Sequence, residues 1–161
     1  MGMEIERKFL VQPCWRPPGA GTPYVQGYLH IGRSGPSVRV RLAGELAFLT
    51  IKGKPQGLAR PEFEYAIPTD EARELLASFA GDRFIEKTRY RIEHTGHTWE
   101  VDVFQGSNSG LILAEVELAR ADEQVVLPDW VACEVSHDHR YSNAYLCMHP
   151  WPEWSDDRGT P

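Results

Sequence analysis

Residues 86–104 of this 161-residue chain read EKTRYRIEHTGHTWEVDVF. Charged side chains occupy every second position on both sides of a central turn-like segment: Lys87, Arg89, Arg91, Glu100 and Asp102. Because successive side chains of a β-strand point to opposite faces, each set of charges shares one face of its strand. The turn-like segment, His94-Thr95-Gly96, is short enough to join the two strands into an antiparallel hairpin. The stretch therefore predicts a basic strand paired with an acidic one.

The same period of two runs along most of the chain, and clusters of proline and glycine separate its segments. The predicted strands are residues 4–11, 24–31, 37–42, 46–52, 62–67, 84–92, 98–104 and 111–119, with a further one near 130–135. Short turn-like connections between several of these segments favour an antiparallel sheet made of hairpins. Eight or nine strands at this spacing indicate a closed barrel or a sandwich.

One clear helix interrupts the strands, at about residues 70–80. Thr69 or Asp70 is its expected N-cap, and Gly81 follows its last residue. Its apolar face is expected to consist of Leu75, Leu76 and Phe79. A second, shorter helix is expected at residues 142–148.

Acidic and basic side chains lie on different strands. This segregation distinguishes a half-exposed sheet from a barrel with a charged interior. A half-exposed antiparallel sheet carries charge on its solvated face, but it has no need to place acids and bases on different strands. Here Arg39 and Arg41 share a basic strand, whereas Glu115 and Glu117 share an acidic one. The apolar faces carry large side chains such as Trp99, which can pack against an outer layer. We therefore expect a mainly β (α+β) fold, an inverted barrel with a charged interior and an apolar exterior partly covered by helices.

Length and composition bound the class of protein. The chain is 42% hydrophobic and 25% charged, which suits one globular domain, expected at residues 1–150 and followed by a short tail at 151–161. A net charge of -6 argues against duplex nucleic acid or an anionic membrane as a partner. No apolar stretch approaches the roughly 20 residues that cross a bilayer. Three widely spaced cysteines form neither a disulfide framework nor a zinc pattern, so a cytoplasmic location is expected.

Opposed clusters of acids and bases in one cavity suit a polyanion together with divalent cations. Lysine and arginine bind phosphate oxygens, and arginine does so through a planar fork. Carboxylates hold Mg²⁺ or Mn²⁺, which are hard ions that prefer oxygen ligands. Bound metal ions would also explain how an acidic protein binds an anion.

The N-terminal segment Glu4-Ile5-Glu6-Arg7-Lys8 resembles the E-x-E-x-K signature of the CYTH superfamily, the triphosphate tunnel metalloenzymes. The resemblance continues in order along residues 3–150. Its further motifs are Val38–Arg41, Thr50–Gly53, Arg60 with Glu62–Tyr65, Lys87–Tyr90, Trp99–Phe104, Glu115–Leu118 and Arg140–Asn143. One E-x-E-x-K alone is a weak signal, whereas the ordered set is strong.

The resemblance implies an eight-stranded antiparallel barrel that forms a tunnel, and it is greatest to the short bacterial members that hydrolyse inorganic tripolyphosphate with Mg²⁺ or Mn²⁺. The metal ligands that it implies are Glu4, Glu6, Glu115 and Glu117, with Glu62, Glu64, Glu100 and Asp102 as further candidates. The phosphate-binding residues that it implies are Lys8, Arg39, Arg41, Lys52, Lys87 and Arg89, with Arg60 and Arg140 as outer candidates. Lys87 or Lys8 would neutralise the leaving pyrophosphate, with Tyr28 as a hydrogen-bonding neighbour.

Other activities remain open at this point. A class IV adenylyl cyclase would share the metals and the triphosphate site, but no adenine pocket is identifiable in the sequence. A thiamine or nucleoside triphosphatase is a second alternative, and a non-catalytic module that binds polyphosphate or nucleotide is a third. The expected partner is a small-molecule triphosphate, and the chain is expected to be a monomer or a homodimer.

Overall fold

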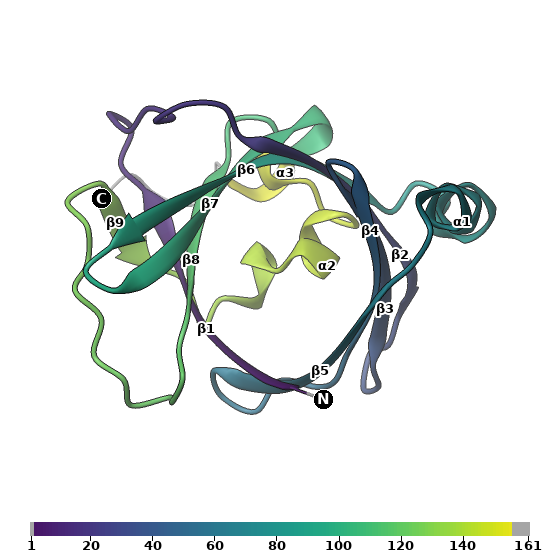
Figure 1. Ribbon diagram of the computed structural model, residues 1–161, viewed down its shortest axis with the longest axis horizontal. Coiled ribbons are helices and arrows are strands. Elements are labelled where there is room, and N and C mark those ends of the chain that lie inside the picture. Colours follow the sequence, from purple (N-terminus) through teal and green to yellow (C-terminus); the bar gives the residue numbers. More distant parts are fainter. Residues whose placement is uncertain (1, 156–161) are drawn as a thin grey trace.

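The computed structural model describes residues 2–155, which form one antiparallel sheet of nine strands with short helices around it (Figure 1). The strands are β1 (Gly2–Val11), β2 (Thr22–Ile31), β3 (Ser37–Ala43), β4 (Leu46–Lys52), β5 (Ala59–Ala66), β6 (Phe84–His94), β7 (His97–Gln105), β8 (Ile112–Glu117) and β9 (Val131–Glu134). Every segment predicted as a strand from the period of two is a strand here, with its ends shifted by a few residues.

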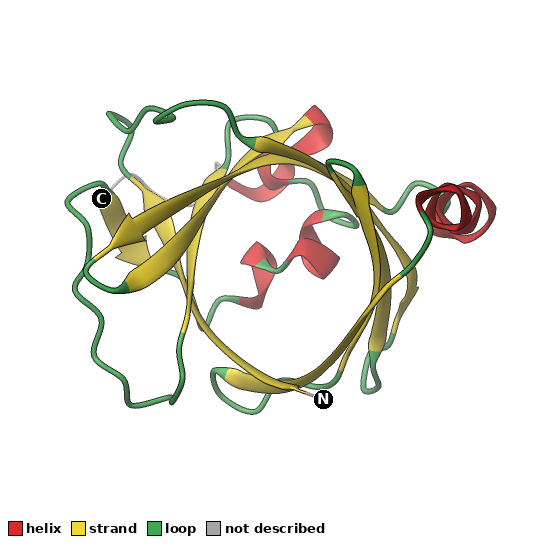
Figure 2. Ribbon diagram, viewed as in Figure 1, coloured by secondary structure: helices red, strands yellow, loops and turns green. Residues whose placement is uncertain are grey.

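The sheet closes on itself as an eight-stranded barrel (Figure 2). Its strand order is β5-β4-β3-β2-β6-β7-β8-β1-β9, and an additional pairing joins β5 to β1. The free edge of β1 is divided between two partners. Its first half pairs with β5, from Gly2 opposite Glu62 to Ile5 opposite Ala59, and its second half pairs with β9. The expected mainly β, antiparallel closed barrel is thus confirmed, with β9 as a ninth strand beside it.

Closure brings the charged faces of the strands together inside the barrel, because alternate side chains of each strand point inward. Directly paired residues show this arrangement. Lys8 of β1 is opposite Glu115 of β8, and Glu115 is in turn opposite Glu100 of β7. Arg89 of β6 is opposite Asp102 of β7. Each pair of opposite residues lies on the same face of the sheet, so the acids and bases of neighbouring strands meet there.

The interior is charged as expected along much of the barrel, and apolar side chains fill the remaining part. Ile85, Phe104 and Leu113 lie two residues from charged positions on the same inner faces, and they belong to a buried apolar cluster. Three short C-terminal helices complete this part of the fold: η3 (His139–Tyr141), α2 (Asn143–Leu146) and α3 (Trp151–Ser155). They supply Tyr141, Leu146 and Trp154 to the cluster. Figure 1 shows α2 across the opening of the ring of strands, so apolar packing fills one end of the barrel.

The helix α1 (Thr69–Leu75), which continues as the π-helical turn η1 (Leu76–Ala80), packs on the outside of the barrel. The buried positions are Ala72, Leu76 and Ala80, whereas Phe79, expected on the apolar face, is exposed. The wider π-helical turn changes which residues face the sheet. The close approach requires Gly27 on β2, because a Cβ there would lie 2.7 Å from a Leu76 methyl carbon.

The ends of this helix differ in how well the sequence predicts them. It begins after Pro68 with no side-chain cap, so neither Thr69 nor Asp70 caps it as expected. Gly81, with φ of 61°, follows its last turn as predicted. This left-handed conformation is one that glycine adopts without the steric cost of a Cβ.

A second apolar layer covers the opposite side of the barrel. Phe9 and Trp99 lie with ring centroids 5.5 Å apart, and Trp130 meets Trp99 edge-on at 5.7 Å. Trp15 from the segment after β1 joins the same cluster. Trp99, which the sequence predicts for the outer face, is therefore buried in this cluster. Phe48, also expected on the outer face, instead lines the interior of the barrel beside Arg41.

The C-terminal segment expected as a tail starts with a helix. Trp151–Ser155 forms α3, and Trp154 is buried against Tyr141. Residues 156–161 of that segment lie outside the described residues. None of the helices that the structure describes combines the length and apolar character needed to cross a membrane.

Candidate active site

A cavity of about 890 Å³ occupies the charged part of the interior, and each of the eight barrel strands contributes to its lining. The predicted site residues that line it are Glu4, Glu6, Lys8, Tyr28, Arg39, Arg41, Lys52, Arg60, Glu62, Glu64, Lys87, Arg89, Glu100, Glu115 and Glu117. The sequence places these side chains on inward faces, and closure of the barrel brings them around one space. Asp102 and Arg140 are the predicted residues that lie outside this lining.

Asp102 lies behind the lining, with none of its surface exposed. Its Oδ1 accepts a hydrogen bond from Arg89 Nε at 2.7 Å, and its Oδ2 accepts from Lys87 Nζ at 2.6 Å and Arg89 Nη2 at 2.7 Å. Burial opposes ionisation, but the charges of Lys87 and Arg89 outweigh it and hold the pKa of Asp102 below its usual value. Both oxygens are thus engaged in holding two cations in place, and the sequence alternation could not reveal this depth.

Lys87 is the most deeply buried cation of the cavity, with 2% of its surface exposed. Besides Asp102, its Nζ donates a hydrogen bond to Asn143 Oδ1 on α2 at 3.2 Å. Burial, together with the nearby positive charge of Arg89, lowers the pKa of Lys87 to about 8. Asn143 was not singled out from the sequence as a site residue, because its contact depends on how α2 packs across the barrel.

Arg140 lies on η3 and forms a local pair outside the cavity lining. Its Nη2 contacts Asp138 Oδ2 at 2.7 Å, and its guanidinium lies 5.0 Å from the ring centroid of Trp154. The contact with Trp154 places its guanidinium against the C-terminal helix α3.

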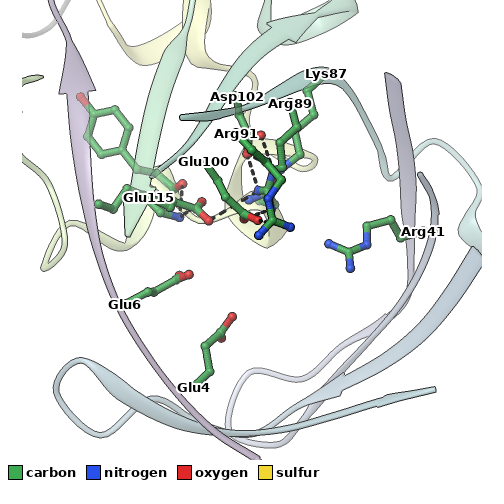
Figure 3. A network of polar contacts seen from close by, with 12 residues as sticks. Glu4, Glu6, Arg41, Lys87, Arg89, Arg91, Glu100, Asp102 and Glu115 are labelled. Atoms are coloured by element: carbon green, nitrogen blue, oxygen red, sulfur yellow. Dashed lines mark hydrogen bonds and ion pairs between the residues drawn. The ribbon is translucent and has the colours of Figure 1, made fainter. Parts of the chain in front are cut away.

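One wall of the cavity, formed by β6, β7, β8 and β1, carries a continuous ion-pair network (Figure 3). Glu115 contacts Lys8 Nζ at 3.1 Å and Arg89 Nη2 at 3.6 Å, and Arg89 also pairs with Glu100. Burial raises the pKa of Glu115, but the charges of Lys8 and Arg89 reverse this and hold it well below its usual value. In Figure 3, Arg41 faces this network from across the cavity.

The opposite wall, formed by β3, β4, β5 and the start of β1, carries separate ion pairs. Lys52 Nζ contacts Glu4 at 2.8 Å and Glu62 at 2.7 Å, and Arg60 Nε contacts Glu4 at 2.8 Å. Although burial opposes ionisation, these two cations lower the pKa of Glu4 to about 2. Glu4 is therefore ionised and firmly paired with cations of its own wall.

Glu64 forms a second pairing on this wall. It contacts Arg41 at 3.1 Å and Arg39 at 3.5 Å, and it accepts a hydrogen bond from Thr50 Oγ1 at 2.7 Å. Thr50 was missed by the sequence analysis as a participant, although it lies on the same inner face of β4 as Lys52. Its hydroxyl fixes the carboxylate that holds both arginines.

Glu6 and Glu117 differ from the other carboxylates because they face each other without a close cation between them. They are direct partners in the pairing of β1 with β8. Glu6 has Arg60 Nη2 at 3.7 Å. Burial, reinforced by the charge of Glu115, raises the pKa of Glu6 to about 7. Burial and the neighbouring carboxylates, first Glu4, also raise the pKa of Glu117, so burial and carboxylate repulsion outweigh the nearby cations at this pair.

A model of the CYTH domain matches residues 26–143. The chain belongs to the CYTH family. An inorganic triphosphatase from Acetivibrio thermocellus is 41% identical over 157 residues, which span 97% of this chain and 100% of that protein. One from Nitrosomonas europaea is 38% identical over 150 residues, which span 90% of this chain and 97% of that protein. The crystal structure of an inorganic triphosphatase aligns with a TM-score of 0.66 and 36% identity, over 92% of this chain and 96% of that one.

Membership of the CYTH family implies dependence on a divalent metal ion. Within residues 2–155, no three Asp, Glu, His or Cys side chains converge closely enough to hold a metal as they stand, because most of the carboxylates are turned toward lysine or arginine. The donor set nevertheless fits a hard cation, since carboxylate oxygens are the ligands that Mg²⁺ and Mn²⁺ favour. Like charges directly opposite each other destabilise a strand pair, so a cation beside Glu6 and Glu117 would relieve their repulsion.

Proposed function

We propose that this CYTH protein hydrolyses inorganic tripolyphosphate to pyrophosphate and phosphate inside the barrel, with Mg²⁺ or Mn²⁺ as its cofactor. The observation that carries the proposal is the cavity, in which arginine and lysine side chains from opposite walls face one another. A linear polyanion between the walls could contact both sets of cations at once. The two relatives named inorganic triphosphatase, which match nearly the whole chain, support the same activity.

The phosphate-binding residues in this proposal are the cations that line the cavity: Lys8, Arg39, Arg41, Lys52, Arg60, Lys87 and Arg89. Each is paired with a carboxylate or held by a neighbouring polar group, so substrate phosphates would replace part of an existing ionic network. Arginine binds phosphate oxygens in a bidentate manner, which fixes the orientation of the chain. Asp102 and Arg140 are left out of direct contact, because neither lines the cavity.

The metal ligands in this proposal are Glu4, Glu6, Glu115 and Glu117, with Glu62, Glu64 and Glu100 as further candidates on the same lining. A bound divalent ion supplies charge neutralisation at phosphate oxygens and helps to orient a water molecule for in-line attack. The carboxylates place negative charge beside the cations, so that metal and phosphate can bind together.

Hydrolysis adds water across one phosphoanhydride bond, and the departing phosphate oxygen needs a positive charge or a proton. Lys87 Nζ and Lys8 Nζ are buried cations that can supply it. Burial raises the pKa of the Tyr28 phenol. Tyr28 therefore keeps its proton at neutral pH and can donate a hydrogen bond to a phosphate oxygen.

The test is phosphate release from tripolyphosphate, ATP, thiamine triphosphate and pyrophosphate, each with Mg²⁺, Mn²⁺ and EDTA. We expect fast, EDTA-sensitive release from tripolyphosphate and little release from pyrophosphate. Cyclic AMP formed from ATP would support the cyclase alternative instead, and preferential cleavage of thiamine triphosphate or ATP would support an organic triphosphatase. Tight binding of tripolyphosphate without any product would support a non-catalytic binding module.

The pH dependence of the reaction should report the charge of Lys87. Because its pKa is lowered to about 8, we expect kcat/KM to fall above pH 8, by about tenfold per pH unit if this charge is essential. The fall would not reflect unfolding. The unfolded chain keeps this proton up to about pH 10.5, so this group makes the free energy of unfolding rise between pH 8 and 10.5.

The matched variant for this prediction is Lys87→Arg, since arginine stays charged throughout the range. Its profile should lack the decline near pH 8, while that of the wild type shows it. Identical alkaline limbs in the two proteins would contradict the assignment to Lys87.

We place the enzyme in the cytoplasm, as a monomer or a homodimer that acts on a small-molecule triphosphate. The three cysteines, Cys14, Cys133 and Cys147, are all free. Free thiols are typical of a reducing compartment.

A further inference from the structure

The ring of Tyr24 lies among three of the cavity's cations. The guanidinium carbons of Arg89 and Arg41 lie 5.1 and 5.2 Å from its centroid, and Lys87 Nζ lies 5.9 Å from it. Tyr24 belongs to β2, which lies between β3 and β6 in the sheet. Its ring therefore reaches the cations of both neighbouring strands, and it lines the cavity that they share.

The carboxylates of the cavity do not link these two sets of cations. Arg41 pairs with Glu64, whereas Lys87 and Arg89 pair with Asp102 and further acids of β7 and β8. In the described part of the chain no carboxylate forms an ion pair with both Arg41 and Arg89. The Tyr24 ring contacts Arg41 of one wall and Arg89 of the other, two cations that otherwise repel each other.

An aromatic ring and a carboxylate hold a cation with different consequences for a ligand. The face of the ring attracts a cation through its quadrupole, but it carries no net charge and leaves that of the cation intact. A carboxylate offsets the charge and occupies N–H donors that phosphate would otherwise use. Two further rings each lie beside one of these cations. The guanidinium carbon of Arg41 lies 5.2 Å from the Phe48 centroid, and Lys87 Nζ lies 5.5 Å from the Phe104 centroid.

We propose that Tyr24 is a positioning residue for triphosphate binding, whose ring holds Arg41 of β3 and Arg89 of β6 at the cavity lining so that both can contact one polyanion. The inference rests on the proposed function and deepens it. The hydroxyl of Tyr24 makes no hydrogen bond in the described part of the chain, so the face of the ring carries the role. The sequence contains a signal for this position of Tyr24. Side chains four positions apart on a strand share a face, so Tyr24 lies on the same face as Tyr28, which the resemblance places in the site.

The experiment compares Tyr24→Leu with Tyr24→Phe, and uses Tyr65→Leu as the matched control. Tyr65 is an exposed tyrosine on the outside of β5 and does not line the cavity. Tyr24→Leu should raise KM for tripolyphosphate about tenfold, equivalent to about 1.4 kcal/mol, with a much smaller change in kcat. Tyr24→Phe should stay within about twofold of wild type because it retains the ring face, and Tyr65→Leu should match wild type.

Calorimetric binding of tripolyphosphate in EDTA provides a second readout that needs no turnover. Tyr24→Leu should weaken this binding about as much as it raises KM. Equal damage from Tyr24→Phe would overturn the proposal, because it would assign the effect to the hydroxyl. A Tyr24→Leu variant that loses thermal stability but keeps wild-type affinity would also overturn it, since the role would then be structural.

The same measurements separate this inference from the proposed function. Wild-type protein that binds tripolyphosphate in EDTA but does not cleave it when Mg²⁺ or Mn²⁺ is supplied would refute the triphosphatase. The affinities of the Tyr24 variants in EDTA would still decide the positioning role. Wild-type turnover with unchanged constants in Tyr24→Leu would refute only the positioning role. A wild type that neither binds nor cleaves tripolyphosphate would overturn both.

Discussion

Replacing Glu115 by alanine is expected to lower kcat/KM for tripolyphosphate at least about 100-fold, the usual scale for losing a preorganised electrostatic group at a reacting centre. Glu115 lines the cavity and contacts Lys8 Nζ at 3.1 Å and Arg89 Nη2 at 3.6 Å. The substitution removes a proposed metal ligand. It also releases two cations from the positions at which substrate phosphates would meet them.

The loss of activity has to be separated from loss of folding, since Glu115 is itself buried. Glu115→Gln keeps the size of the side chain and removes only its charge, so it should retain the thermal midpoint better than Glu115→Ala while remaining nearly inactive. Glu45→Ala, at an exposed turn position between β3 and β4, serves as the control and should behave as wild type. A folded Glu115→Gln protein with wild-type turnover would refute the metal-ligand role.

Replacing Asp102 by alanine should cause a large loss of stability. The carboxylate is fully buried and holds Lys87 and Arg89 through three hydrogen bonds of 2.6 to 2.7 Å. Removing one member of a buried ion pair leaves an uncompensated charge, which typically costs about 3–5 kcal/mol. Denaturant unfolding should therefore show a clear fall in the free energy of unfolding, with loss of turnover alongside it.

Asp122→Ala is the matched control for this prediction. Asp122 pairs with Arg120 at 3.1 Å on the surface, where both side chains are largely exposed. Exposed pairs contribute little, so its loss should change the free energy of unfolding by no more than about 0.5 kcal/mol. Similar stabilities for Asp102→Ala and Asp122→Ala would show that the buried network is not what holds this wall together.

The local pattern of the sequence predicts most of the strands because each alternates apolar and charged residues over its length. Closure of the barrel is different, since it depends on β1 meeting β5, and nothing in the pattern of either strand encodes that meeting. The apolar end of the interior is likewise not encoded in the pattern of any single strand. Ile85 and Phe104 continue the inward faces of charged strands, but only the packing of the C-terminal helices shows that this end is apolar.

The candidate site is predictable to the extent that it depends on which face of a strand a residue occupies. Alternation places Glu100 and Asp102 on the same face of a strand and does not distinguish them. In the structure Glu100 lines the cavity, whereas Asp102 lies behind the lining. Depth along the barrel axis decides this difference, and a period of two carries no information about depth. Arg140 shows a second limit, because its position depends on the local pair with Asp138 rather than on a strand.

The strands that pair with β1 come from distant parts of the chain, so β1 completes its pairing late in synthesis. β1 is synthesised about 100 residues before its partners β8 and β9, and Arg7 binds a glutamate 127 positions away. Such long-range pairing slows folding, because loop-closure entropy is lost before the contacts form. Residues 6–11 of β1 therefore lack their partners until β8 and β9 have been synthesised. Alternate charges such as Glu6 and Lys8 are a feature that keeps unpaired strand edges from aggregating.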